Sequence, residues 1–192
     1  MKEINSIIGY NLKNIRKNKG FSLDKVTEMT GVSKAMLGQI ERGESNPTVA
    51  TLWKIATGLK VSFSSFLEKN YNGKELSLVS YTKINPIIEE EGNMIIYPLF
   101  FFDVNRGFEI FTIKLNSGCN HVSESHDDGV EEYIIVTEGI VDITVGEATY
   151  KLEKGDAIRF HANKNHIYRN TSEQHACFEN IIYYFGTVNK LS

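Results

Sequence analysis

The chain has 192 residues, enough for two small domains, and 41% of them are hydrophobic, so each domain can bury a core. Its formal net charge of −3 is unevenly distributed. Residues 1–70 hold eleven Lys and Arg against six Asp and Glu, a net +5, whereas residues 71–192 hold ten against eighteen, a net −8. We therefore expect two domains with different partners, of which the basic one can attract phosphates.

The sequence favours a cytoplasmic protein with no membrane partner. No apolar run reaches the roughly 18 residues of a membrane-spanning helix. The opening stretch MKEINSIIGYNLKNIRKNKG mixes charged and apolar residues, unlike a signal peptide. Cys119 and Cys177 are expected to be free thiols, as is usual in the cytoplasm, and a redox switch is the alternative.

Residues 4–67 predict a bundle of five helices. Apolar residues recur on one face of the first, at Ile4, Ile7, Ile8, Leu12 and Ile15. Ser22 and Ser33 are placed to cap the second and third helices, and Gly31 ends the second. A fourth helix follows Pro47, and SFSSFLEK from Ser62 predicts a short fifth.

The second and third predicted helices are separated by Thr30-Gly31-Val32-Ser33. Two short helices joined by a tight turn are typical of a helix-turn-helix, whose second helix enters the major groove of DNA. We expect Met36, Leu37 and Ile40 to point inward. Gln39 suits a bidentate contact with adenine. The predicted DNA-binding residues are Ser33, Lys34, Ala35, Gly38, Gln39, Arg42, Asn46 and Thr48.

About sixty residues, IGYNLKNIRKNKG through GVSKAMLGQIERGESNPT to TLWKIATGLKVSFSSFL, resemble the XRE-type, or lambda-repressor-like, helix-turn-helix family. Thr27 departs from the pattern, since the family usually has Ala there. The resemblance implies a double-stranded DNA operator as partner. It also implies an ion pair between Arg16 and Glu41. A helical bundle that binds protein instead of DNA is the alternative.

From Leu76 onward the pattern changes to short β-rich runs separated by turn residues. The runs are LSLVSY, MIIYPLFFF, FEIFTIKL, EEYIIVT, IVDITV, ATYKLE, AIRFH and FENIIYYF. Such runs predict an antiparallel β-barrel or sandwich. The predicted organisation is α + β: a helix-turn-helix domain at 1–68, a linker at 69–75 and a β-barrel domain at 76–192.

Two stretches, GCNHVSESHDDGVEEYIIVTEG and GDAIRFHANKNHIYRN, resemble the two motifs of the cupin family, a jelly-roll type of barrel. In the first, Gly118 is followed by five residues and then Glu124-Ser125-His126, and six residues separate Glu132 from Gly139. In the second, Gly155, His166 and Asn170 match in spacing. The family binds a divalent metal with residues at these positions. The resemblance implies Zn, Mn, Fe or Ni on Glu124, His126, Glu132 and His166.

The match is incomplete, and alternatives remain open. Glu124 stands where the family has His, and Glu131 competes with Glu132, which we prefer for its distance from Gly139. The pocket could instead bind an organic ligand directly, with Tyr133, Phe160, Tyr168 and Tyr183 as its wall. His121 and His175 are expected at the surface, and His161 at the barrel mouth.

Together these features predict a sequence-specific transcription regulator, not an enzyme, whose cupin domain senses a small-molecule effector or metal. The alternative is a metal-dependent cupin enzyme fused to a DNA-binding domain. A homodimer joined through its barrels and an operator with an inverted repeat are expected.

Overall fold

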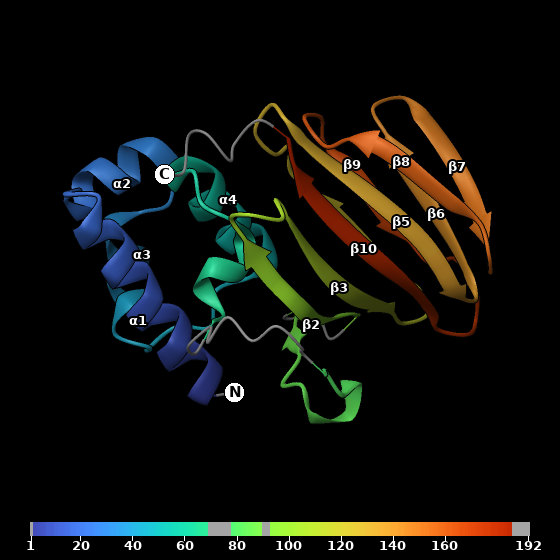
Figure 1. The fold of residues 1–192 in the computed structure, drawn as a ribbon, viewed down its shortest axis with the longest axis horizontal. Helices are drawn as coiled ribbons and strands as arrows, with labels where there is room; N and C mark the ends of the chain where they lie inside the picture. Colours follow the sequence, from blue (N-terminus) through green and yellow to red (C-terminus); the bar gives the residue numbers. More distant parts are fainter. Residues whose placement is uncertain (1, 69–77, 90–92, 186–192) are drawn as a thin grey trace. The chain divides into compact units, whose positions relative to one another are not determined.

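The computed structural model describes residues 2–68, 78–89 and 93–185 (Figure 1). It divides into two compact units, Met1–Leu78 and Val79–Ser192, which we call the helical unit and the β unit. The predicted linker at 69–75 lies outside the described residues. Each unit is considered by itself below.

The described helical unit has four α-helices, not the five predicted. They are α1 (Lys2–Asn18), α2 (Leu23–Thr30), α3 (Lys34–Glu41) and α4 (Val49–Leu59). The expected fifth helix is the single 3-10 turn Phe63–Phe66. Its buried rings stand three residues apart, which is the repeat of a 3-10 helix, and the hydroxyls of Ser62 and Ser65 lie 2.6 Å apart.

The helix ends follow the predicted chemistry. The hydroxyls of Ser22 and Ser33 accept hydrogen bonds from backbone N–H groups in the first turns of α2 and α3. Gly31 ends α2 with φ of +69°, a conformation that costs glycine little. These two caps and the turn between them set the angle between α2 and α3, as expected of a helix-turn-helix.

The β unit consists of two antiparallel sheets. The strands are β1 (Ile87–Ile88), β2 (Met94–Asp103), β3 (Phe108–Leu115), β4 (Asn120–Ser123), β5 (Val130–Glu138), β6 (Ile140–Val145), β7 (Ala148–Glu153), β8 (Ala157–His161), β9 (His166–Arg169) and β10 (Ala176–Tyr184). The six-stranded sheet has the order β1-β2-β3-β10-β5-β8, and the four-stranded sheet β4-β9-β6-β7.

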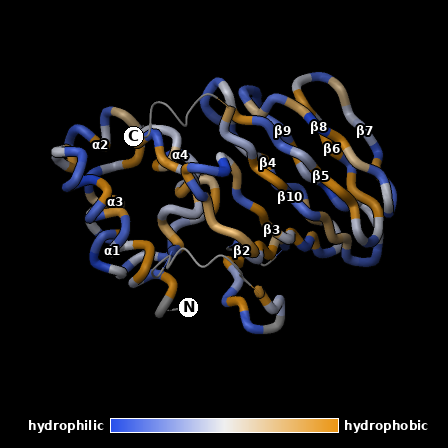
Figure 2. Tube along the Cα trace, in the orientation of Figure 1, coloured by the Kyte–Doolittle hydropathy of each residue, from blue (hydrophilic) through white to orange (hydrophobic). Residues whose placement is uncertain are grey.

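The predicted closed barrel is wrong for the described residues. No hydrogen-bonded ladder joins the edges of the two sheets among them, so the unit is a two-sheet sandwich. Along β5 and β10, alternate residues are buried between the sheets. Figure 2 shows hydrophobic residues along the strands and hydrophilic residues at the turns.

Seven of the eight predicted β-rich runs are strands. The exception is LSLVSY, whose described residues 78–80 are irregular and lead into the 3-10 helix Tyr81–Lys83. Three short strands, β1, β4 and β9, lie outside the eight predicted runs. The strand β4 has the sequence NHVS, in which the polar residues His121 and Ser123 point inward and the apolar Val122 points outward. This arrangement is the opposite of the usual half-buried strand, in which apolar residues point inward, so the alternation does not predict a strand here.

Candidate functional sites

The exposed face of α3 is the candidate DNA-reading surface. Six of the eight predicted residues are exposed: Ser33, Lys34, Ala35, Gln39, Arg42 and Asn46. Gly38 is buried, because the Arg42 side chain lies over it and its Nη1 would be 3.2 Å from an added Cβ. Thr48 is half-buried, and its hydroxyl caps α4 by accepting a hydrogen bond from the N–H of Thr51.

The prediction that Met36 points inward from α3 is wrong. Its exposed fraction is 37%, whereas Leu37 and Ile40 are fully buried. At 100° per residue Leu37 and Ile40 define the centre of the buried stripe, and Met36 lies at its edge. The Met36 side chain therefore flanks the surface that carries Gln39.

Both cations of this face are paired with neighbouring carboxylates. Lys34 Nζ lies 2.9 Å from Asp24 Oδ2, and Arg42 Nη2 lies 2.8 Å from Glu44 Oε2. All four side chains are more than half exposed, so these pairs contribute little to stability. Lys34 and Arg42 can exchange these partners for phosphates at small cost.

The predicted Arg16–Glu41 ion pair is confirmed. The Arg16 guanidinium donates from Nε to Glu41 Oε1 at 2.6 Å and from Nη2 to Oε2 at 2.8 Å. Nη1 also donates to the carbonyl of Phe21 at 3.0 Å. The Glu41 carboxylate raises the pKa of Arg16 above its ordinary value, although burial opposes this. The pair connects α1 to α3 and orients the reading helix.

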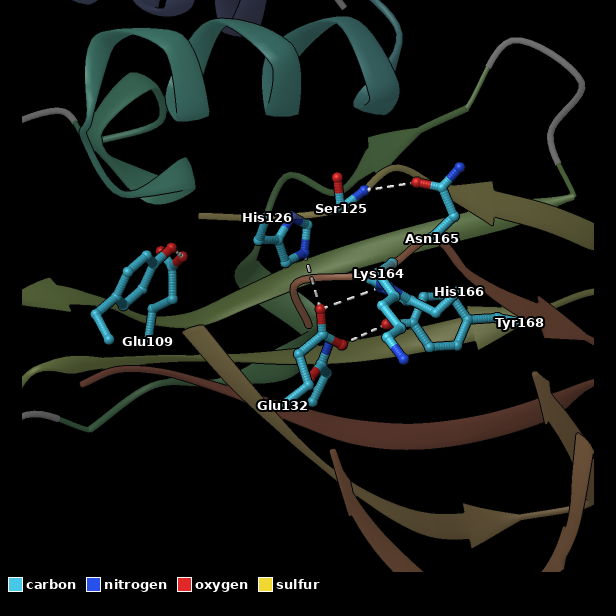
Figure 3. Close-up of polar contacts among 10 residues, drawn as sticks. Glu109, Ser125, His126, Glu132, Lys164, Asn165, His166 and Tyr168 are labelled. Atoms are coloured by element: carbon cyan, nitrogen blue, oxygen red, sulfur yellow. Dashed lines mark hydrogen bonds and ion pairs between the residues drawn. The ribbon is translucent and has the colours of Figure 1, made fainter. Parts of the chain in front are cut away.

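Three of the four predicted metal ligands converge between the sheets (Figure 3). His126 follows β4, Glu132 lies on β5 and His166 begins β9, and all three are buried. Glu132 Oε1 lies 2.9 Å from His126 Nε2 and 3.3 Å from His166 Nε2. Two imidazole nitrogens thus face one carboxylate oxygen. We call these three residues the buried cluster.

Neighbouring groups hold the buried cluster in place. The other oxygen of Glu132, Oε2, accepts hydrogen bonds from the Tyr168 hydroxyl and from Asn180 Nδ2, the latter at 3.0 Å. His166 Nδ1 lies 3.0 Å from the carbonyl of Lys164. Because a carbonyl can only accept, Nδ1 carries the proton, and in the neutral imidazole Nε2 then presents its lone pair to the cluster.

Electrostatics keep the carboxylate charged. Burial alone would raise the pKa of Glu132, but the charge of His166 and the close approach of both imidazoles hold that pKa well below its ordinary value. Burial would lower the pKa of His166, yet the Glu132 carboxylate raises it. Burial and the charge of Glu132 keep the pKa of Tyr168 well above its ordinary value, so Tyr168 remains a donor.

The donor set fits a divalent transition metal. Two imidazoles and one carboxylate are ligands that Zn, Mn, Fe and Ni accept, and three protein ligands leave coordination positions open. His166 Nε2 is buried and makes no well-aligned hydrogen bond. The Lys164 carbonyl, in turn, orients the ring as outer partners of metal-bound histidines do.

The fourth predicted ligand, Glu124, is not part of the buried cluster. Its side chain is exposed, and it is absent from the group of residues whose ligand atoms lie within 4.8 Å of one another. Glu124 comes directly after β4, whose inward positions are His121 and Ser123, so alternation turns it outward. The proposed four-residue ligand set is therefore corrected to three residues.

The four predicted pocket residues divide between two faces. Tyr168 contacts Glu132, and the Phe160 ring lies 5.2 Å from the His166 ring, between centroids. Tyr133 and Tyr183 instead lie on the outer face of the six-stranded sheet, where they line a shallow hollow of about 260 Å³. They cannot contact a ligand in the buried cluster, because successive strand residues point to opposite faces.

Two of the buried polar residues that the sequence did not indicate, His121 and Asn180, contact Tyr168 or Glu132 beside the buried cluster. His121 was expected at the surface, but it is buried, with Nδ1 2.9 Å from Glu89 Oε1 and its ring stacked on Tyr168. Asn180 was not singled out. Asn180 lies two residues from both Phe178 and Ile182 on β10, so its side chain points to the same buried face. This alternation in the sequence could have identified it as an inward polar residue. Of the other histidines, His161 and His175 are partly or largely exposed.

A helical unit with a capped reading helix and a β sandwich with a buried His/Glu cluster define a class, the helix-turn-helix regulators that carry a cupin domain. A helix-turn-helix family model matches residues 12–66, and a cupin domain model matches residues 111–182. The chain is 41% identical over 184 residues to the HTH-type transcriptional regulator SutR of Escherichia coli, covering 96% of this chain and 98% of SutR. It belongs to this family of HTH-type transcriptional regulators.

Solved structures agree with this assignment. An HTH_3 family transcriptional regulator from Vibrio cholerae has a TM-score of 0.81 and 43% identity, over 95% of this chain and 98% of that one. The structure of FeII HppE has a TM-score of 0.51 and 13% identity, over 93% of this chain and 99% of that one, a likeness of fold alone. Among the described residues, no helix is long and apolar enough to cross a membrane.

Proposed function

We propose that this regulator reads an operator through α3 and senses a metal or a small organic effector through its β unit, without catalysing a reaction. The observation that carries the sensor proposal is the fully buried Glu132 carboxylate shared by two histidines. A buried carboxylate needs a compensating cation or proton at that point. The match to SutR, a protein named as a transcriptional regulator, covers 98% of the length of SutR and supports the regulatory role. A regulator that binds DNA must reach it, so we propose a cytoplasmic location.

We propose Gln39 as the main base-reading residue of α3. It is exposed on the reading face, and its amide suits adenine. Gln39→Ala should weaken binding to the cognate operator by about 1–3 kcal/mol and relax its sequence preference. A gel shift with genomic fragments at fixed salt measures both effects. Lys34 is also expected to contact a base, so Lys34→Ala should likewise relax the sequence preference; if it weakens all sequences about equally and reduces the salt dependence, Lys34 contacts only phosphate.

If Gln39→Ala leaves operator selectivity unchanged, the proposed orientation of α3 on DNA is wrong. If the wild-type chain binds no genomic fragment at low salt, the proposal that α3 reads DNA is wrong and the alternative of a protein-binding helical unit is favoured.

We propose that His126, Glu132 and His166 hold Zn, Mn, Fe or Ni, with open coordination positions for an effector. Protein purified without a metal-binding tag should contain bound metal, and His166→Ala should contain about one ion per chain less than the wild type. His161→Ala is the matched control, since His161 also lies beside a glutamate but is 73% exposed. Elemental analysis with native mass spectrometry decides the question.

Wild-type protein that retains an organic molecule and no metal, with His166→Ala retaining neither, would show that the cluster binds the effector directly. His126→Ala and His166→Ala should preserve DNA binding and abolish the effector response. If both variants respond normally, the buried cluster is not the sensor.

A further inference from the structure

A second group of metal-ligating side chains, one exposed and two partly buried, lies where β5 ends and β10 begins. Glu138 ends β5, and His175 and Cys177 flank the first residue of β10. The ligand atoms of these three residues all lie within 4.8 Å of one another. His175 Nε2 is 3.3 Å from Glu138 Oε1. No part of the function proposed above uses them.

We propose that Glu138, His175 and Cys177 form a second binding site, for a divalent transition metal such as Zn²⁺. A thiolate, an imidazole and a carboxylate are the three donor types that proteins offer to zinc. Binding displaces the proton of the Cys177 thiol, and water can complete the coordination. The site is thus chemically distinct from the buried cluster, which has no sulfur ligand.

Sheet pairing brings the three ligands together. Cys177 lies directly opposite Glu138 in the antiparallel ladder, and the register shifts immediately after Cys177. His175 and Cys177 are two residues apart and so project to the same side of the extended chain. The Thr137 hydroxyl donates to the carbonyl of Cys177 at 3.2 Å, which fixes the two strand ends relative to each other.

At Gly139, the backbone of the turn after β5 packs directly against the backbone of His175. It has φ of +73°, and a Cβ there would lie 2.8 Å from the carbonyl oxygen of His175 and 3.0 Å from Ala176. Only glycine permits so close an approach of the two backbones. The backbones of all three ligands are therefore set before an ion arrives, and binding needs to order only side chains.

Access and charge also favour an ion here. The side chains of His175 and Glu138 are 41% and 60% exposed, so an ion can enter without separating the sheets. Lys114 on β3 pairs with Cys177 across the ladder, and its positive charge would repel a metal cation. The carboxylates of Glu138 and Glu179, which also face this side of the sheet, offset that charge.

Cobalt(II) tests the proposal, because a cobalt–thiolate bond gives a near-ultraviolet charge-transfer band that histidine and carboxylate ligands do not. The reduced full-length protein, titrated with Co²⁺, should develop this band at about one ion per chain, and Zn²⁺ should displace it. Cys177→Ser should abolish the band. His175→Ala should weaken Co²⁺ binding about tenfold or more.

Three matched variants should keep the band. His161→Ala removes another exposed histidine, which lies 3.4 Å from Glu131 but has no thiol beside it. Cys119→Ser removes the other free cysteine, which is buried. His166→Ala disables the buried cluster and so separates this test from that of the sensor.

Absence of the band at millimolar Co²⁺ would overturn the proposal. A band that survives Cys177→Ser would overturn it as well, because the sulfur ligand would then lie elsewhere. His175→Ala protein that binds like the wild type, or a band lost in His161→Ala or His166→Ala, would show that these three residues do not form an independent site.

Discussion

At the scale of single residues, the Arg16–Glu41 pair shows how a buried charge makes its partner indispensable. Their side chains are only 14% and 7% exposed. The pair itself adds little net stability, but removing one partner leaves the other charge buried and uncompensated, at about 3–5 kcal/mol. Arg16→Ala should lower the free energy of unfolding of the helical unit by about that amount.

Urea unfolding followed by the fluorescence of Trp53, the chain's one tryptophan, measures this, since Trp53 stacks on Phe63 within the helical unit. The double variant Arg16→Ala/Glu41→Ala should recover part of the loss. Arg42→Ala is the control, because its pair with Glu44 is more than half exposed and should change stability by about 1 kcal/mol or less. Strictly additive losses in the cycle would contradict the coupling.

At the scale of secondary-structure elements, two helices pack so closely that one glycine is required between them. Gly58 lies on α4, and a Cβ there would be 2.6 Å from Thr30 Cγ2 and 2.8 Å from the carbonyl oxygen of Met29 on α2. Alanine in a helix is ordinarily up to about 1 kcal/mol more stable than glycine. Here the contact with backbone should reverse that sign.

Gly58→Ala should therefore destabilise the helical unit by about 1–3 kcal/mol in the same fluorescence-monitored unfolding. Gly38→Ala on α3 is the control. Its added Cβ would meet only the flexible end of Arg42, at 3.2 Å, so the ordinary helix preference should apply and stability should stay equal or rise. A stabilising Gly58→Ala would mean that α2 and α4 separate without cost.

At the scale of the whole molecule, we propose a homodimer formed through the outer face of the six-stranded sheet. Ile135, 41% exposed, stands there beside the hollow lined by Phe108, Tyr133, Ile181 and Tyr183. One helix-turn-helix covers few base pairs, and a two-fold dimer would read an inverted repeat with half-sites one helical turn or a multiple apart.

Sedimentation at micromolar concentration should show a dimer, and Ile135→Glu should shift it toward monomer and weaken operator binding. Val122→Glu is the matched control, because Val122 is similarly exposed at 48% but lies on β4 in the other sheet. A monomeric wild type with an asymmetric footprint would refute the dimer. A dimer that Ile135→Glu leaves intact would place the interface elsewhere.

The features determined by the sequence itself are those that depend on near neighbours in the chain. The change from a helical to a strand pattern, the caps at Ser22 and Ser33 and the turn at Gly31 follow from local backbone chemistry, and the structure has them where they were predicted. The Arg16–Glu41 pair also followed from the sequence, but only through the family resemblance.

Tertiary structure decided which residues share a face across strands that are distant in sequence. Motif spacing could not separate Glu124 from the three residues of the buried cluster, because a side chain's direction depends on where its strand begins to pair. The same phase sends Tyr133 outward while Glu132, one residue earlier, turns inward. Whether the sheets close into a barrel likewise depends on pairing between edge strands, which no local pattern specifies.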